Sequence, residues 1–79
     1  MDETKKARLR AQVNRLFKSN PEGSVIELVI NDKVSDECTY PIPHNHYVEI
    51  GSKSPIEWLN ICLCFYVKSG DKVGLRIRR

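Results

Sequence analysis

The 79-residue sequence lacks several features on which many enzymes and membrane proteins depend. None of its four glycines belongs to a glycine-rich loop of the phosphate-binding kind. Its longest apolar run, Ile61–Val67, is far shorter than the roughly 20 residues that cross a bilayer. Cysteine and histidine occur, but neither an oxyanion turn nor a third orienting residue accompanies them. We therefore expect no enzyme activity, no cofactor and no membrane partner.

The cysteine count and the chain length set two further limits. Three cysteines are an odd number, so they cannot all pair within the chain. The first twenty residues hold no charged and then apolar leader with a small-residue cleavage site. We therefore expect a cytoplasmic location with free thiols. A chain this short builds only a thin core, so residues 1–79 are predicted to form a single domain.

The net charge of +3 is unevenly distributed along the chain. Residues 1–19 carry six basic and two acidic side chains (6 − 2 = +4), and residues 61–79 carry five and one (5 − 1 = +4). Residues 20–60 carry two and seven (2 − 7 = −5). If the two basic ends lie side by side, they form one positive surface suited to nucleic acid or an acidic protein. The alternative is that each charge lies on a solvated face.

Hydrophobic periodicity predicts a helix followed by strands. Leu9, Val13 and Leu16 recur at helical spacing, which indicates an amphipathic helix over residues 4–18. Alternating β-branched residues predict a strand at 25–31, a turn at 31–33, a weaker returning strand at 34–42 and a short strand at 47–50. A helix with a narrow apolar stripe is not stable alone, so it is expected to pack on this sheet.

The C-terminal third is predicted to be mostly strand. Ser54-Pro55-Ile56-Glu57 has the residues of a capping box, so a helical turn is expected at 55–59. The run from Trp58 to Val67 is apolar on every side, and its period does not distinguish helix from strand. We favour a strand at 60–68 and a hairpin at 69–71 into a strand at 72–78. That register sets Phe65 opposite Leu75.

These elements predict an α+β fold. It has an N-terminal amphipathic helix packed on a roughly four-stranded antiparallel sheet, with a short helical turn before a C-terminal β-hairpin. The predicted core consists of Leu9, Val13, Leu16, Phe17, Ile26, Leu28, Ile30, Leu63, Phe65, Val67, Val73, Leu75 and Ile77, with Trp58 at its rim.

The first functional hypothesis is a small non-enzymatic protein-binding module or inhibitor that occupies a partner's surface. Because compact chains of this kind are common among phages and mobile elements, we expect an origin of that kind. The partner is expected to be a protein, such as part of a nucleic-acid-processing complex. Aromatic and basic side chains on a proline-flanked loop and on the C-terminal hairpin are the candidate contacts. These residues are Tyr40, His44, His46, Tyr47, Tyr66, Arg76 and Arg78.

Three alternatives remain open. The first is nucleic-acid binding by the N-terminal helix and the C-terminal hairpin, through Arg8, Arg15, Lys72, Arg76 and Arg78. The second is a homodimer in which another copy covers the face of the hairpin that the helix leaves open. The third is a small metal-binding protein, since the histidine pair 44/46 and the cysteine pair 62/64 are each two residues apart. Neither pair has zinc-finger spacing, so no residue is assigned to a metal.

Overall fold

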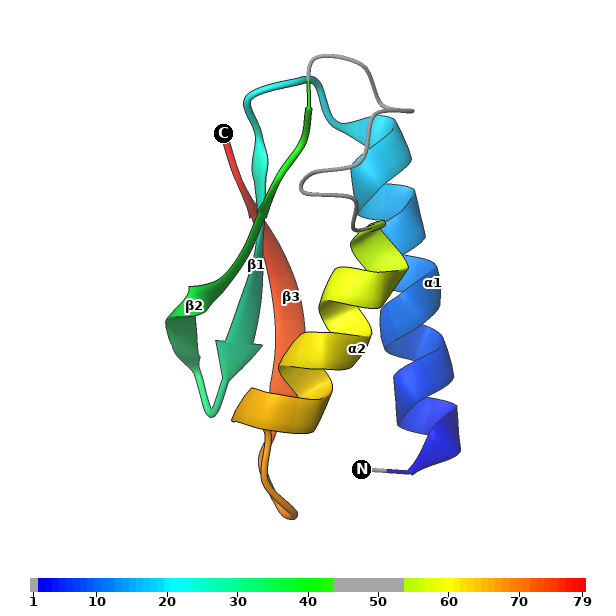
Figure 1. The fold of residues 1–79 in the computed structure, drawn as a ribbon, viewed down its shortest axis with the longest axis vertical. Helices are drawn as coiled ribbons and strands as arrows, with labels where there is room; N and C mark the ends of the chain where they lie inside the picture. The colour runs from blue at the N-terminus through cyan, green and yellow to red at the C-terminus, as the bar shows by residue number, and fades with distance from the viewer. Residues whose placement is uncertain (1, 44–53) are drawn as a thin grey trace.

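The computed structural model describes residues 2–43 and 54–79 and shows an α+β fold. Three strands form one antiparallel sheet in the order β2-β1-β3, and both helices lie on the same side of it (Figure 1). The elements follow in the order α1 (Glu3–Ser19), β1 (Val25–Ile30), β2 (Lys33–Pro41), α2 (Pro55–Tyr66) and β3 (Val73–Arg78). The prediction of about four strands is wrong for the described residues, and the strand expected at 47–50 lies outside them.

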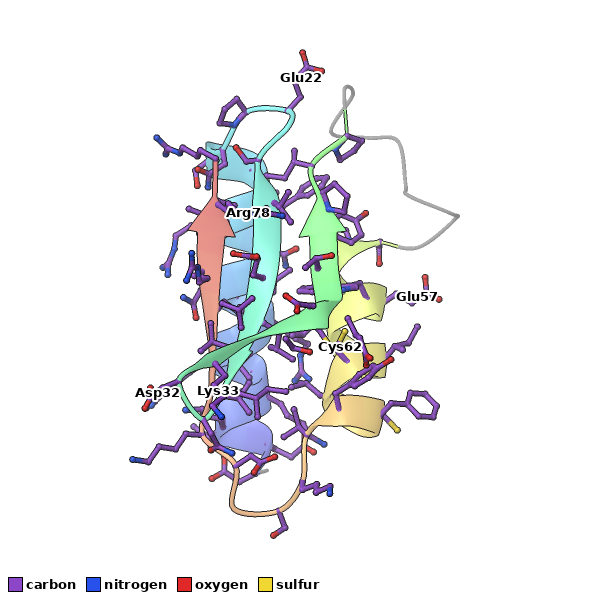
Figure 2. The ribbon with its side chains drawn as sticks, turned by 90° about the vertical axis from the view of Figure 1, so that its left-hand side faces the viewer. Glu22, Asp32, Lys33, Glu57, Cys62 and Arg78 are labelled. Carbon is purple, nitrogen blue, oxygen red and sulfur yellow. The ribbon has the colours of Figure 1, made fainter. Side chains whose placement is uncertain are left out.

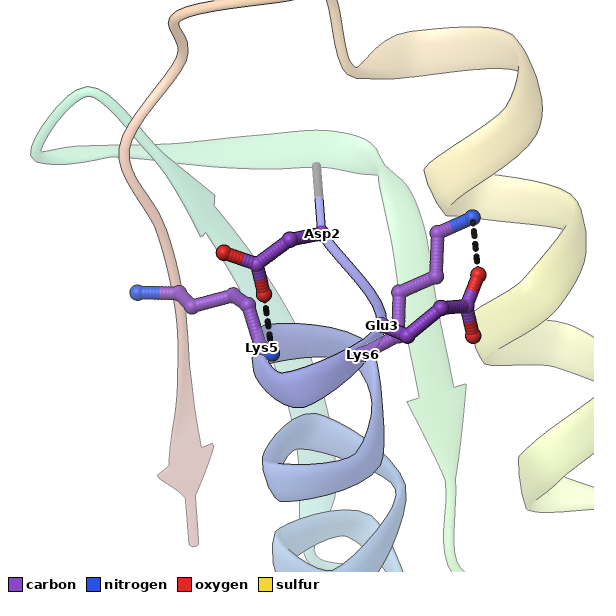
Figure 3. A network of polar contacts seen from close by, with 4 residues as sticks. All are labelled: Asp2, Glu3, Lys5 and Lys6. Atoms are coloured by element: carbon purple, nitrogen blue, oxygen red, sulfur yellow. Dashed lines mark hydrogen bonds and ion pairs between the residues drawn. The ribbon is translucent and has the colours of Figure 1, made fainter.

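Helix α1 forms where the sequence predicts it and is capped at both ends. Asp2 accepts a hydrogen bond from the Lys5 backbone N–H at 2.7 Å, and Glu3 pairs with Lys6 at 3.7 Å (Figure 3). At the other end, the Asn20 side-chain amide donates to the Leu16 carbonyl at 2.9 Å. The Asp2 and Asn20 hydrogen bonds satisfy backbone groups that helix ends leave unpaired.

Strands β1 and β2 form a hairpin across a two-residue turn. Asn31 and Asp32 have φ values of 52° and 67°, a conformation that Asn and Asp tolerate better than most residues. The register then shifts, because Val29 lies opposite Val34 whereas Glu27 lies opposite Thr39. Between these pairs β1 advances two residues and β2 advances five, so β2 bulges away from its partner.

Helix α2 replaces the strand predicted at 60–68. The capping box forms as expected, with Ser54 Oγ accepting from the Glu57 backbone N–H at 3.2 Å and Pro55 in the first turn. The helix then continues to Tyr66. The prediction relied on the β-propensity of the apolar run, but propensity is a weak preference that tertiary packing readily overrides.

Strand β3 forms as predicted but pairs with β1, so the predicted C-terminal hairpin is wrong. Leu75 lies opposite Leu28 and Ile77 lies opposite Ile26. The chain between Tyr66 and Val73 therefore passes from the end of α2 to the edge of the sheet beyond β1 (Figure 1). Phe65 has no counterpart in the sheet.

The core lies between the sheet and the two helices. Leu9, Val13, Ile26, Leu28 and Val73 are buried as predicted, whereas Phe65 is 75% exposed, so its assignment to the core is wrong. The other predicted core residues are partly buried and pack against this cluster. Trp58, predicted at the rim of the core, is 8% exposed. Further residues join the core that were not predicted there, namely Cys38, Tyr40, Ile42, Leu59 and Cys62.

Candidate protein-binding surface

Helix α2 presents apolar side chains to solvent as well as to the core. Leu59 and Cys62 point inward and are buried, and Figure 2 shows Glu57 pointing away from the sheet. At 3.6 residues per turn, Ile61, Cys64 and Phe65 share the outward half of the helix with Glu57. Cys64 is exposed and Ile61 is half-buried. We call Ile61, Cys64 and Phe65 the α2 surface.

A groove of about 400 Å³ borders the α2 surface on the side of α1. Leu63 and Cys64 give it an apolar wall on α2, and Lys6 and Arg10 give it a basic wall on α1. Lys6 is partly neutralised by Glu3, whereas Arg10 forms no ion pair among the described residues. The groove therefore combines apolar surface with one uncompensated cation. Its lining residues are Glu3, Lys6, Arg10, Asn60, Leu63 and Cys64.

Tyr66 ends α2 and lies beside the bulge of β2. The negative charge of Glu37 raises the pKa of the Tyr66 hydroxyl above its ordinary value, and a side-chain hydrogen bond with the same carboxylate acts in the same direction. The hydroxyl thus stays protonated, as a donor requires. Since Tyr66 is 42% exposed, part of the ring remains accessible next to the α2 surface.

Tyr40, the one predicted contact of the aromatic loop that the structure describes, is buried. Tyr40 is only 2% exposed and packs against Phe17 and Trp58, with ring centroids 6.1 and 5.7 Å away. Its side chain therefore has almost no surface to offer a partner. The other predicted contacts of this loop, His44, His46 and Tyr47, lie outside the described residues.

Arg76 and Arg78 lie on the face of the sheet that the helices leave open, where Figure 2 shows Arg78. Between them lies Glu27, whose side chain is 8% exposed. Its carboxylate is 3.2 Å from Nε of Arg76 and 3.5 Å from Nε of Arg78. One carboxylate thus offsets part of the charge that the sequence analysis assigned to this strand.

The residues predicted to bind nucleic acid are divided between two layers of the fold. Arg8 and Arg15 are exposed on α1, in the helix layer. Arg76 and Arg78 lie on the open face of the sheet, and Lys72 is exposed just before β3. The two basic groups are therefore carried by different elements.

Cys62 and Cys64 do not face the same way, contrary to the metal-binding alternative. In a strand they would share a face, but on α2 two positions correspond to about 200° of rotation. Cys62 is accordingly buried and Cys64 exposed. Within residues 2–43 and 54–79 no three His, Cys, Asp or Glu side chains are grouped so as to hold a metal ion.

The α2 surface was not predicted, because the sequence pattern favoured a core strand for Phe65. The capping box at Ser54 contained the missing information. Continuing the helix from that cap places Ile61, Cys64 and Phe65 on one side. A helix that exposes apolar residues opposite its buried side is unusual for an isolated domain.

Comparison of the chain with family models, curated proteins and solved structures found no match. Among the described helices none has the length and apolarity needed to span a membrane. The surfaces of the chain itself are therefore what indicates its function. Of these, the α2 surface and the open face of the sheet are the two with unusual chemistry.

Proposed function

We propose that this protein is a small non-enzymatic protein-binding module that docks through the α2 surface. The observation that carries the proposal is Phe65, which is 75% exposed on a helix that is buried on its other side. Large apolar side chains that a helix exposes opposite its buried side commonly mark an interaction site. A protein partner is the simplest means of enclosing this one, because aromatic anchors supply much of the energy of protein interfaces.

The groove beside the α2 surface indicates the chemistry of the partner. An apolar side chain of the partner fits against Leu63 and Cys64, and an acidic side chain fits Arg10. Glu57 and Asn60 supply a polar border, as interface rims generally do. An inhibitory role follows if the surface that the module covers is the working site of its partner.

Nucleic-acid binding has less support. A phosphate-binding surface gains affinity from many adjacent cations. Here Glu27 offsets part of the charge of Arg76 and Arg78, and Arg8 and Arg15 are carried by α1 rather than by the sheet. The predicted cations therefore do not all come from one strand or helix face.

The proposal is tested by capture of partners with tagged wild-type protein and two matched variants. Phe65→Glu places a charge on the α2 surface, whereas Ser69→Glu places the same charge at a nearby exposed loop position. We expect one protein to be retained from nuclease-treated extract by the wild type and by Ser69→Glu but not by Phe65→Glu. Equal thermal midpoints of the three proteins would show that folding is unaffected.

Two results would contradict the proposal. Retention of the same protein by Phe65→Glu would remove the α2 surface as the contact. Capture that disappears with nuclease or moderate salt would indicate nucleic acid instead. Sedimentation of the purified chain tests the homodimer alternative. A wild-type dimer that becomes a monomer in Phe65→Glu would identify a second copy as the partner on the α2 surface.

A further inference from the structure

Strand β3 is a regular edge strand with an open side. It pairs with β1 in continuous register over all six of its residues, and no other described strand neighbours it. The opposite edge differs, because β2 contains the bulge and ends in Pro41. Bulges and prolines are common means of protecting an edge from further pairing. Only β3 thus offers an unprotected edge in the described sheet.

One hydrogen bond fixes which backbone groups face that open side. The Asn31 N–H donates to the Lys72 carbonyl at 2.7 Å, just before the first ladder pair of Ile30 with Val73. Hydrogen-bonded and non-hydrogen-bonded pairs alternate along an antiparallel ladder. Because Asn31 and Lys72 are a hydrogen-bonded pair, the next residue, Val73, belongs to a non-hydrogen-bonded pair. The N–H and C=O groups of Val73, Leu75 and Ile77 therefore point away from β1.

The side chains along β3 specify two different chemistries. On the open face, Arg76 and Arg78 direct Nε toward Glu27, and their side chains are 56% and 59% exposed. On the helix side, Leu75 and Ile77 are only partly buried although they belong to the core layer. The edge is therefore basic on the open face of the sheet. On the helix side it presents apolar surface that is incompletely covered.

We propose that the free edge of β3 binds an extended acidic segment of a partner protein as a fourth strand. The backbone of the added strand would hydrogen-bond to Val73, Leu75 and Ile77. Its acidic residues would lie beside Arg76 and Arg78, and the alternate apolar residues would cover Leu75 and Ile77. The segment thus alternates acidic and apolar residues.

A second copy of β3 is a poor occupant of this edge. Two-fold pairing centred on Arg76 sets that residue against its own copy, and pairing centred on Ile77 sets Arg76 against Arg78. Like charges directly opposite each other destabilise a strand pair. Charge complementarity therefore favours an acidic segment over self-association.

The test uses a fluorescent eight-residue peptide of alternating Glu and Val with the full-length protein. Amide hydrogen exchange is followed residue by residue with and without the peptide. We expect exchange at Val73, Leu75 and Ile77 to slow at least tenfold at saturation, roughly the change for 1.4 kcal/mol of protection, with little change at Gly74 and Arg76, which already pair with β1. A peptide of alternating Lys and Val is the charge control and should not bind.

A charge-neutral variant separates this surface from the α2 surface. Glu27→Gln/Arg76→Gln/Arg78→Gln removes the cations without leaving the carboxylate unpaired, and it should lose at least tenfold in peptide affinity, while Phe65→Glu should bind as the wild type does. Binding of the Lys-Val peptide with equal affinity, or no added protection at the three outward amides, would overturn the proposal. So would preferential binding of duplex DNA that competes with the peptide.

Discussion

The side-chain amide of Asn31 donates a hydrogen bond of 2.9 Å to Oδ1 of Asp71, forty residues along the chain. The same Asn31 side chain accepts from the Lys72 N–H at 2.9 Å, and the Lys68 N–H donates to Asp71 Oδ2 at 2.8 Å. These contacts join the β1–β2 turn to the loop that leads into β3. They fix the point at which the edge strand starts to pair with β1.

Asp71 makes the stability of the protein depend on pH in the acid range. The Lys68 backbone N–H, and then the Asn31 amide, hold the pKa of its carboxyl below the ordinary value of 3.8. A depressed folded-state pKa contributes stability above the unfolded-state value and loses it as pH falls through the folded-state value. Urea unfolding between about pH 2 and pH 6 should show wild type more stable than Asp71→Asn, with the difference shrinking below about pH 4. A difference that stays constant with pH would contradict this assignment.

Leu59 and Phe65 lie on the same helix, but truncating them should change the free energy of unfolding by very different amounts. Leu59 is fully buried, so Leu59→Ala should lower the free energy of unfolding by about 2–5 kcal/mol. Phe65→Ala removes an exposed ring and should change it by no more than about 0.5 kcal/mol. Denaturant titration of both variants checks this. Similar losses would mean that Phe65 is enclosed in the folded protein.

Removing Arg76 and Arg78 should destabilise the protein mainly because Glu27 is then nearly buried without a cation. Arg76→Ala with Arg78→Ala leaves a nearly buried carboxylate without its two cations. The double variant should lose about 1–3 kcal/mol of unfolding free energy. Adding Glu27→Gln should restore part of it, as a thermodynamic cycle by denaturation would show. A further loss in the triple variant would contradict the pairing.

The three thiols should differ in reactivity. Cys64 is exposed, whereas Cys38 and Cys62 are buried. A thiol reagent such as Ellman's reagent should therefore modify one cysteine quickly in the native protein and the other two only on unfolding. Cys64→Ser should abolish the fast phase. A fast phase that persists in this variant would show that Cys38 or Cys62 becomes accessible in the native protein.

Local patterns predicted the N-terminal helix, the first two strands and the last strand correctly. They failed for α2, because an apolar run without a period leaves the choice between helix and strand to distant packing partners. The pairing of β3 with β1 was not predicted for the same reason. Tyr40 illustrates the limit for the candidate site, since its burial depends on Phe17 and Trp58 from two other elements. No local spacing in the sequence predicts that these three aromatic rings pack together.

The bulge in β2 also has a consequence for assembly. A sheet with two regular edges can polymerise, because each added strand exposes a new edge like the one it covered. Here the bulge and Pro41 disrupt one edge. Within the described sheet, copies of this chain therefore lack the second regular edge that stacking of whole molecules into a fibre requires. The asymmetry lets the described sheet expose one regular edge without offering its own copies a matching one.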